Sequence, residues 1–221
     1  MPLIPARMLL NEKSRRSGVI PYTSTSNGTL YFLLGVDART GDLTDLGGGV
    51  KKGENGLCAA FRELSEESCG LLRPNLNDMS ECPSLMNTEM RMSVVFMPVA
   101  SGFLRTITRD FDMARKHTSS ASSKEMRELK WVHETEFFIL LSNKYLQQKD
   151  GTRLSLWFRV RSFIGKEYCK TRREITDTLR EVAIYRPFFT HVSRSTSRGR
   201  KFVTGRFRDA FQPRRSVSCY V

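Results

Sequence analysis

The chain has 221 residues, and its 36 Lys and Arg against 23 Asp and Glu give a formal net charge of +13. It is long enough for one domain with a sizeable core. We expect no transmembrane helix, because no run of about eighteen apolar residues occurs. We also expect no signal peptide, because the N-terminus lacks a long apolar core and a small-residue cleavage site. A protein this basic is expected to attract a polyanion.

The cysteines and histidines indicate the compartment and argue against one class of metal site. Five cysteines are widely spaced, with no Cys-x-x-Cys pair. This pattern favours reduced thiols in an intracellular, cytoplasmic protein over a disulfide framework or a zinc site. Three isolated histidines lack the spacing of metal ligands, so we interpret each as structural or surface-exposed.

Two strands are predicted near the N-terminus. Residues 17–23 (SGVIPYT) and 30–37 (LYFLLGVD) are rich in β-branched and aromatic residues, and they flank a polar turn at residues 24–29. Residues 38–49 are predicted to form a loop that ends in three consecutive glycines. The first part of the chain therefore predicts a hairpin that leads into a Gly-rich turn.

Behind this turn, residues 55–68 are predicted to form one helix that carries a cluster of acidic side chains. Glu63 and Glu67 are four residues apart, and Glu63 and Glu66 are three apart, so they are neighbours on one helix surface. Like charges this close repel each other unless something positive lies between them. Because carboxylate oxygens suit hard ions, the spacing predicts a site for Mg²⁺ or Mn²⁺.

A solvated helix face is the alternative interpretation, since most acidic runs on helices are of that kind. Such a helix would place lysines four residues from its acids, whereas Arg62 is the only base within residues 55–68. An apolar stripe that includes Ala60 and Leu64 is expected to pack the helix on a core. The pattern therefore favours the metal site.

The segment resembles the signature of Nudix hydrolases, in which glycine, glutamate and arginine positions follow one another at fixed spacing. The matching positions are Gly48, Glu54, Arg62, Glu63, Leu64, Glu66 and Glu67. The end of the signature departs from the family, because Cys69 stands where a Gly is expected and Gly70 follows one residue later. We expect Gly70 to end the helix in a left-handed conformation.

The resemblance implies which residues hold the metal and carry the reaction. It implies that Mg²⁺ or Mn²⁺ is held by the backbone carbonyl of Gly47 and by the carboxylates of Glu63, Glu66 and Glu67. Glu63 and Glu67 are also the helix residues to which catalysis is assigned. The implied chemistry is attack of water on a phosphorus of a diphosphate bridge, with the metal ions activating the water and neutralising charge.

Four further residues are implied to support the site or take part in it. Arg62 and Glu54 are expected to pair and to brace the loop against the helix. Gly48 is expected to let the backbone approach the phosphates closely. Many Nudix enzymes resemble this chain in having a Glu just before a later strand, so Glu125 is assigned as a further metal ligand or general base, with Glu128 as its substitute and an exposed loop glutamate as the alternative interpretation.

Downstream of the acidic helix, the chain is expected to alternate between loops, strands and helices. Residues 72–89 are predicted to be a loop or insertion, and residues 102–124 a loop with a short helix around 111–115. The further predicted elements are strands at 90–100 and 126–133 and helices at 134–141, 154–168 and 172–185. Strands before and after one acidic helix match an α/β protein, a Nudix-like α/β/α sandwich with a mixed sheet.

The resemblance covers residues 17–141, which divides the chain into four parts. The predicted parts are a basic N-terminal segment at 1–16, a Nudix domain at 17–141, a helical extension at 142–190 and a basic tail at 191–221. In the tail, eight Lys and Arg against one Asp give a net charge of +7, with four interleaved aromatics. That composition is expected of a single-stranded nucleic-acid contact, and a solvated tail with no fixed ligand is the alternative. The candidate contacts are Arg194, Arg198, Arg200, Lys201, Arg206 and Arg208.

The function implied by the resemblance is hydrolysis of an acid anhydride in a nucleoside diphosphate derivative. Within that class we favour the 5′ cap of mRNA, because an RNA body needs the phosphate contacts that a basic surplus supplies. The chain also resembles Nudix proteins of large DNA viruses, some of which are decapping enzymes. One alternative is a small-molecule pyrophosphatase acting on diphosphoinositol polyphosphates, dinucleoside polyphosphates or nucleotide sugars. Another is a non-catalytic RNA-binding module. No membrane partner is expected, and the oligomeric state is left open.

Overall fold

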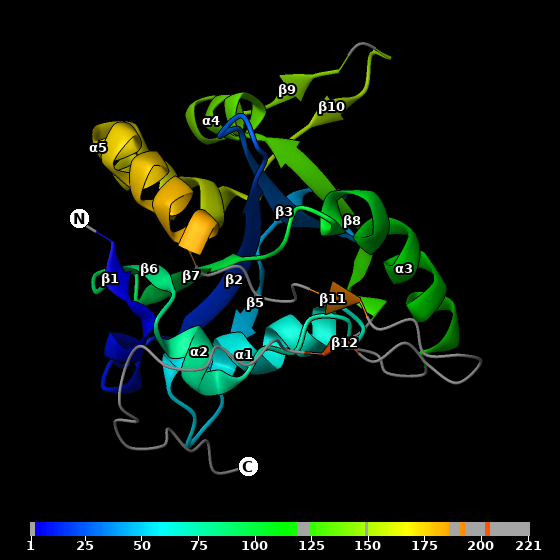
Figure 1. The fold of residues 1–221 in the computed structure, drawn as a ribbon. Coiled ribbons are helices and arrows are strands. Elements are labelled where there is room, and N and C mark those ends of the chain that lie inside the picture. The colour runs from blue at the N-terminus through cyan, green and yellow to red at the C-terminus, as the bar shows by residue number, and fades with distance from the viewer. Residues whose placement is uncertain (1–2, 119–123, 149, 186–190, 193–201, 204–221) are drawn as a thin grey trace.

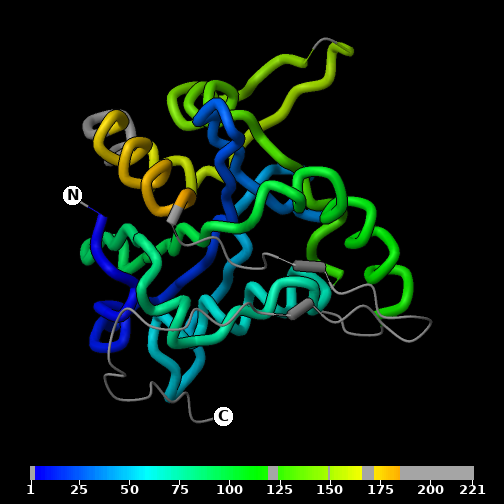
Figure 2. The backbone as a smooth tube through the Cα atoms, in the orientation of Figure 1, coloured from blue at the N-terminus to red at the C-terminus, as the bar shows by residue number. Residues whose placement is uncertain are grey.

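The computed structural model describes residues 3–118, 124–148, 150–185, 191–192 and 202–203 (Figure 1). Figure 2 follows the same backbone as a tube in the same orientation. Within these residues, the chain forms one central sheet with helices on both of its faces.

The sheet is mixed and comprises eight strands in the described part of the chain. The strand order is β1-β6-β7-β2-β3-β4, while β5 pairs with β2 and β8 pairs with β3. The β2 and β7 pair is parallel and the other pairs are antiparallel. The strands are β1 (Ile4–Pro5), β2 (Arg16–Ser24), β3 (Leu30–Asp37), β4 (Leu43–Thr44), β5 (Leu46–Gly49), β6 (Pro83–Asn87), β7 (Met92–Pro98) and β8 (Met126–His133).

Helices cover the two faces of the sheet and bury a separate apolar cluster on each. Figure 1 shows α4 and α5 on one side and α1 and α3 on the other. The helices are η1 (Ala6–Leu10), α1 (Gly56–Glu67), α2 (Leu76–Ser80), α3 (Phe103–His117), α4 (Glu134–Ser142) and α5 (Phe158–Tyr185). Two short hairpins complete the description, β9 (Leu146–Gln147) with β10 (Arg153–Leu154) and β11 (His191–Val192) with β12 (Phe202–Val203). The predicted α/β sandwich with a mixed sheet is confirmed. No helix in the described ranges is long and apolar enough to cross a membrane.

The acidic helix α1 begins and ends where the sequence indicates. The side chain of Asn55 accepts a hydrogen bond of 2.9 Å from the backbone N–H of Cys58 and so caps the first turn. At the other end, Gly70 has the expected left-handed backbone, with φ of 75°. Cys69 is left-handed too, with φ of 53°, a conformation that costs a residue with a Cβ about 1–2 kcal/mol.

The prediction of a loop at residues 102–124 with a short helix around 111–115 is wrong for most of the loop, because α3 occupies Phe103–His117 and includes the short helix. Phe103, Ile107 and Phe111 are buried and lie four residues apart, so they form one apolar side of this helix. Arg105 and Arg109 between them are exposed, whereas Asp110 is buried beside Phe111, and these charged residues hide the period in the sequence. The stretch at 72–89 likewise contains α2 and β6, and the two helices predicted at 154–168 and 172–185 form the single helix α5.

The chain beyond residue 142 packs against the same sheet. In α5, Val160, Phe163 and Leu179 belong to the apolar cluster that Ile20 of β2 also joins. Just before α5, the N–H of Leu43 donates to the carbonyl of Ser155 and the N–H of Trp157 donates to the carbonyl of Leu43. Residues 155–157 therefore lie parallel beside β4. The predicted boundary between residues 141 and 142 stays a prediction, although α5 shares the core of the sheet.

Replacing Phe163 by Ala is expected to lower the free energy of unfolding by about 3–5 kcal/mol, because its fully buried ring would leave a cavity under α5. Phe158→Ala on the same helix is the matched control. Its side chain is 58% exposed, so the change should be within about 0.5 kcal/mol. Denaturant unfolding measures both. A loss of stability in Phe163→Ala as small as that in Phe158→Ala would mean that α5 contributes no core packing.

Candidate metal and hydrolysis site

The Gly-rich turn of β5 holds the first carboxylate of the acidic helix. In the antiparallel pair of β5 with β2, Gly47 lies opposite Gly18. Gly48 faces α1, and a Cβ on Gly48 would overlap the carboxylate of Glu63. The backbone of β5 can therefore lie directly against Glu63 only because residue 48 has no side chain.

Glu67 is the most deeply buried carboxylate of the predicted metal set. Its side chain is 3% exposed, and the backbone N–H of Gly47 donates to it. Burial raises the pKa of Glu67 well above its ordinary value, and the nearby charges of Asp45 and Glu63 raise it further. Its Oε2 atom has no hydrogen-bond partner among the described residues. A buried carboxylate oxygen without a partner suits a cation.

Arg62 lies in the centre of the acidic cluster and joins the loop to the helix. Its Nε atom lies 2.8 Å from Glu54 Oε1, its Nη2 atom donates to Glu54 Oε2 at 3.1 Å, and Nη2 also donates to the carbonyl of Gly49 at 2.9 Å. Nη1 lies 2.6 Å from Glu63 Oε1 and 3.5 Å from Glu66 Oε2. The predicted pairing of Arg62 with Glu54 is therefore present. Its contact with the two helix carboxylates was not predicted.

The pKa values of Glu54 and Glu63 shift in opposite directions. Burial alone would raise the pKa of Glu54, but hydrogen bonds from Arg62 and from the N–H of Lys51 lower it below its ordinary value. Burial raises the pKa of Glu63, although Arg62 opposes the shift, and the charges of Glu66 and Glu125 add to it. Glu54 is thus stabilised as a carboxylate, whereas burial outweighs the Arg62 ion pair at Glu63.

Glu125 lies near the helix carboxylates, as the sequence analysis expected of it. It is exposed, and its backbone carbonyl accepts a hydrogen bond of 2.8 Å from Ala38. Its charge is close enough to Glu63 to raise the pKa of that residue. Glu128, the substitute considered for the same role, lies within β8 opposite Val36. The placement favours Glu125, and its role as ligand or base stays a prediction.

An ion pair between Arg16 and Asp45 is the part of the site that the sequence analysis missed. Arg16 Nη1 donates to Asp45 Oδ2 at 2.8 Å and Nη2 to Oδ1 at 2.6 Å, while Nη2 also donates to the carbonyl of Gly47 at 2.9 Å. Asp45 is fully buried. The two residues lie 29 positions apart, Arg16 on β2 and Asp45 between β4 and β5, so no local spacing connects them. Gly18, two residues after Arg16, and Asp45, two residues before the three glycines, were the available signals.

The Arg16 and Asp45 pair also requires glycine two residues after Arg16 on β2. A Cβ on Gly18 would overlap the carboxylate of Asp45. Burial alone would lower the pKa of Arg16, but the adjacent Asp45 raises it, and Glu67 and Glu63 add to the rise. Arg16 therefore remains charged and lies close enough to Glu63 and Glu67 to interact with their charges.

The donor set fits a hard divalent cation, although the arginines occupy parts of it. Among the described residues, no three His, Cys, Asp or Glu side chains converge closely enough to hold a metal ion in this arrangement. Arg62 contacts the facing oxygens of Glu63 and Glu66, and Arg16 donates to the carbonyl of Gly47. The chemistry of the set nevertheless suits Mg²⁺ or Mn²⁺, because all its donors are carboxylate or carbonyl oxygens and one buried oxygen of Glu67 has no partner.

Two further expectations from the sequence have separate outcomes. The basic tail residues proposed to contact nucleic acid lie outside the described residues, so that proposal stays a prediction; they are Arg194, Arg198, Arg200, Lys201, Arg206 and Arg208. The expectation of reduced thiols is wrong at Cys58, which is disulfide-bonded. Among the described residues, Cys69 and Cys82 take part in no disulfide.

Comparisons with known proteins find similarity in structure only. No protein-family model matches the chain, and no curated protein sequence matches it. A MutT/nudix family protein from Enterococcus faecalis is similar at 12% identity and a TM-score of 0.44, over 81% of this chain and 70% of that chain. An Ap4A hydrolase of C. elegans in a binary complex is similar at 15% identity and a TM-score of 0.33, over 77% of this chain and 96% of that chain.

A MutT/nudix family protein from Listeria innocua is similar at 15% identity and a TM-score of 0.36, over 75% of this chain and 98% of that chain. Two of these three structures carry the family name that the motif of this chain resembles. At such identities and TM-scores they do not assign a function. The function proposed below therefore depends on the motif and on the geometry of its residues.

Replacing Gly48 by Ala is expected to weaken Mn²⁺ binding by at least about tenfold, because the new Cβ would push the Glu63 carboxylate away from the loop. Folding should survive, since the atoms displaced are the far end of a flexible side chain. Gly49→Ala is the matched control, because nothing lies within 4 Å of its would-be Cβ. Calorimetric titration with Mn²⁺ measures both. Equal affinities in the two variants would remove Glu63 from the metal set.

Proposed function

We propose that the chain is a Nudix hydrolase that uses Mg²⁺ or Mn²⁺ to cleave a diphosphate linkage in a nucleotide derivative. One observation carries the proposal. The signature residues lie in one loop-and-helix unit. Glu63 packs on Gly48, and Glu67 accepts a hydrogen bond from the N–H of Gly47. Arg62 connects Glu54 of the loop to Glu63 of the helix. Such a unit presents oxygen donors beside a backbone that phosphates can approach closely.

The residues of the chain divide the work of the reaction. Metal ions held by Glu63, Glu66, Glu67 and the Gly47 carbonyl would lower the pKa of water and neutralise charge on the diphosphate. Arg62 fixes the side chain of Glu54 and orients the carboxylates that it contacts. The burial of Glu67 keeps bulk water away from the innermost donor. Glu125, exposed and near Glu63, is assigned to take the proton of the attacking water.

The favoured substrate is RNA with a 5′ cap, cleaved to a nucleoside diphosphate and a 5′-monophosphate RNA. The net charge of +13 supports this choice, because the acidic site leaves the positive charge for other surfaces. A small-molecule pyrophosphatase is the alternative within the same chemistry. A binding module without activity is disfavoured, because Glu54 and the three helix carboxylates are all present.

A substrate panel tests the proposed function directly. Purified protein with Mg²⁺ or Mn²⁺ is offered capped RNA, free cap dinucleotide, diphosphoinositol polyphosphates and dinucleoside polyphosphates. Release of a nucleoside diphosphate from capped RNA is expected to have the highest kcat/KM. Faster cleavage of a small molecule would replace the decapping assignment, and no cleavage of any diphosphate would overturn the hydrolase.

Glu66→Gln and Glu67→Gln are each expected to lower kcat by at least about a hundredfold, or about 2.7 kcal/mol of activation free energy. Each change removes a metal-binding charge at nearly constant volume, so folding should persist. Excess chelator should abolish wild-type activity, and Mg²⁺ or Mn²⁺ should restore it. Steady-state kinetics on the best panel substrate provides the measurement, with circular dichroism as the folding control. Wild-type turnover in either variant would make the metal assignment wrong.

Glu125→Gln is expected to lower kcat by about 10²–10⁴-fold, the usual range for loss of a general base. Glu128→Gln is the matched control, because it removes the same charge three residues away within β8. Its kcat should remain close to that of wild type, because Glu128 lies within β8 opposite Val36 and is assigned no role in the site. The two pH–rate profiles are compared, because only loss of a base should remove the acidic limb. The reverse ranking would assign the role to Glu128.

A further inference from the structure

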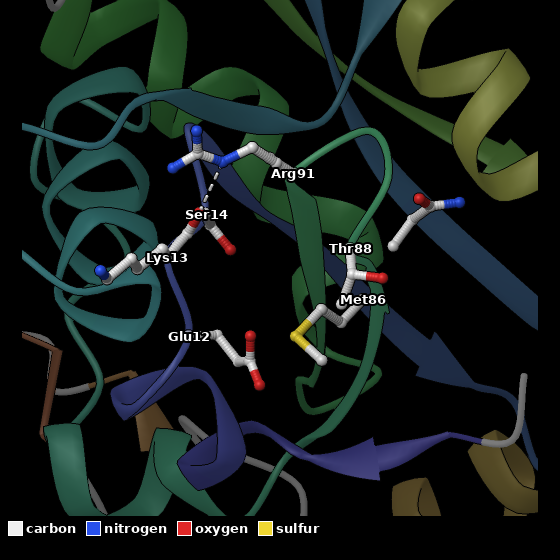
Figure 3. A pocket seen from close by; sticks show the side chains of 7 residues that line it. Glu12, Lys13, Ser14, Met86, Thr88 and Arg91 are labelled. Carbon is white, nitrogen blue, oxygen red and sulfur yellow. Dashed lines mark hydrogen bonds between the residues drawn. The ribbon is translucent and has the colours of Figure 1, made fainter.

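A basic groove lies beside the Gly-rich turn and is not part of the metal site. It consists of two adjoining hollows of about 350 and 470 Å³ that share Glu12, Lys13, Ser14 and Arg91. The smaller hollow, shown in Figure 3, lies between the N-terminal segment and the β6–β7 turn, and Glu12 and Met86 face it from opposite sides. The larger one extends along the loop that precedes α1.

Five basic residues from three separate segments line the groove. They are Lys13 and Arg15 of the N-terminal segment, Lys51 and Lys52 of the Gly-rich loop, and Arg91 of the β6–β7 turn. All but Arg91 are exposed. In the part of the chain that the structure describes, none of the five forms an ion pair within 4 Å. Unpaired charges lining one groove attract a polyanion.

The groove has a fixed wall, because backbone contacts hold the N-terminal segment to the β6–β7 turn. The carbonyl of Arg91 accepts from the N–H groups of Arg15 and Arg16, at 2.7 and 3.3 Å. Arg91 Nε donates to the carbonyl of Lys13 at 3.0 Å, drawn as the dashed line in Figure 3. Arg91 keeps a left-handed backbone, with φ of 51°, to make these contacts. A strained turn that persists is over-determined by its surroundings.

A chain of contacts connects the groove to the proposed metal site. Glu54 lines the larger hollow and accepts a hydrogen bond of 3.0 Å from the N–H of Lys51. The same carboxylate binds Arg62, which in turn contacts Glu63. A molecule lying in the groove would therefore have one end next to the carboxylates. The groove thus leads away from the position proposed for the diphosphate.

We infer that the groove binds the sugar–phosphate backbone of a single-stranded RNA whose 5′ end is in the metal site. The inference rests on the proposed hydrolase and identifies the body of its substrate. The groove's lining includes no aromatic side chain, so it offers no platform for stacking bases. Its charges come from three segments placed along two hollows, which matches successive phosphates of a chain more closely than one compact ligand. Binding of RNA in the groove is therefore expected to be independent of the base sequence.

The test compares two double variants that remove the same charge. Lys13→Gln with Arg15→Gln alters the groove at exposed side chains away from the carboxylates. Lys144→Gln with Arg173→Gln removes one Lys and one Arg after α4 and on α5, where both are exposed. Binding of a short, 3′-labelled capped RNA is followed by fluorescence anisotropy in EDTA across a salt series. Hydrolysis of free cap dinucleotide is measured separately with Mg²⁺.

The groove variant is expected to bind the capped RNA on the order of tenfold more weakly, and its salt slope should fall by about 1.4, or 0.7 for each lost phosphate contact. The control variant should match wild type, and cap dinucleotide hydrolysis should be unchanged in all three proteins. Unchanged RNA affinity in the groove variant would overturn the inference. Equal weakening in both variants would also overturn it, because net charge alone would then explain binding.

The failure of this inference can be distinguished from failure of the proposed hydrolase. Binding is measured without metal and without turnover, so groove-dependent RNA binding supports the surface even if no substrate is cleaved. Cleavage of cap dinucleotide together with groove-independent RNA binding would keep the hydrolase and reject the groove. A rise in KM for diphosphoinositol polyphosphate, with RNA affinity unchanged, would identify the groove as a small-ligand site and overturn the inference.

Discussion

A buried ion pair ties the glycines of the site to the central strand of the sheet. Arg16 begins β2, Asp45 immediately precedes β5, and their side chains meet in two hydrogen bonds while Arg16 also binds the Gly47 carbonyl. Removing either charge from water is costly unless its partner is in place. The ion pair therefore fixes the position of the β5 backbone. This position in turn determines how Gly47 and Gly48 pack against α1. The arrangement in turn depends on Gly18, which leaves room for the Asp45 carboxylate.

The carboxylates of α1 are crowded, and the chain compensates their charge unevenly. Arg62 neutralises the outer part of the cluster, where Glu54 is held as a carboxylate and Glu63 and Glu66 are contacted. Among the described residues, the charge of Arg16 and the N–H of Gly47 offset the burial of Glu67 in part. Protein groups thus leave a deficit of positive charge at the inner end of the helix, and a divalent ion would supply it.

The sequence predicted the parts of this molecule that depend on short spacing. The strands β2, β3 and β8 and the helix α1 lie within one or two residues of their predicted bounds, because each has a strong local period and marked ends. Arg62 and Glu54 were paired correctly from a known motif. The Arg16 and Asp45 pair was not predicted, since it arises from the packing of two strands. Only residues 111–115 of α3 were predicted to be helical, because the apolar side of this helix consists of three residues among many charged ones.

The contacts beside β4 determine when the site is completed during synthesis. Strand β4 lies immediately before Asp45, and its outer neighbours are residues 155–157; Asp42 and Ser155, whose side chains are hydrogen-bonded, are 113 positions apart. A ribosome that has released the acidic helix has therefore not yet released the residues that complete this edge. Pairings over such separations form late, because the intervening chain must first close on itself. A nascent chain thus carries all of its signature glutamates well before it has a finished site.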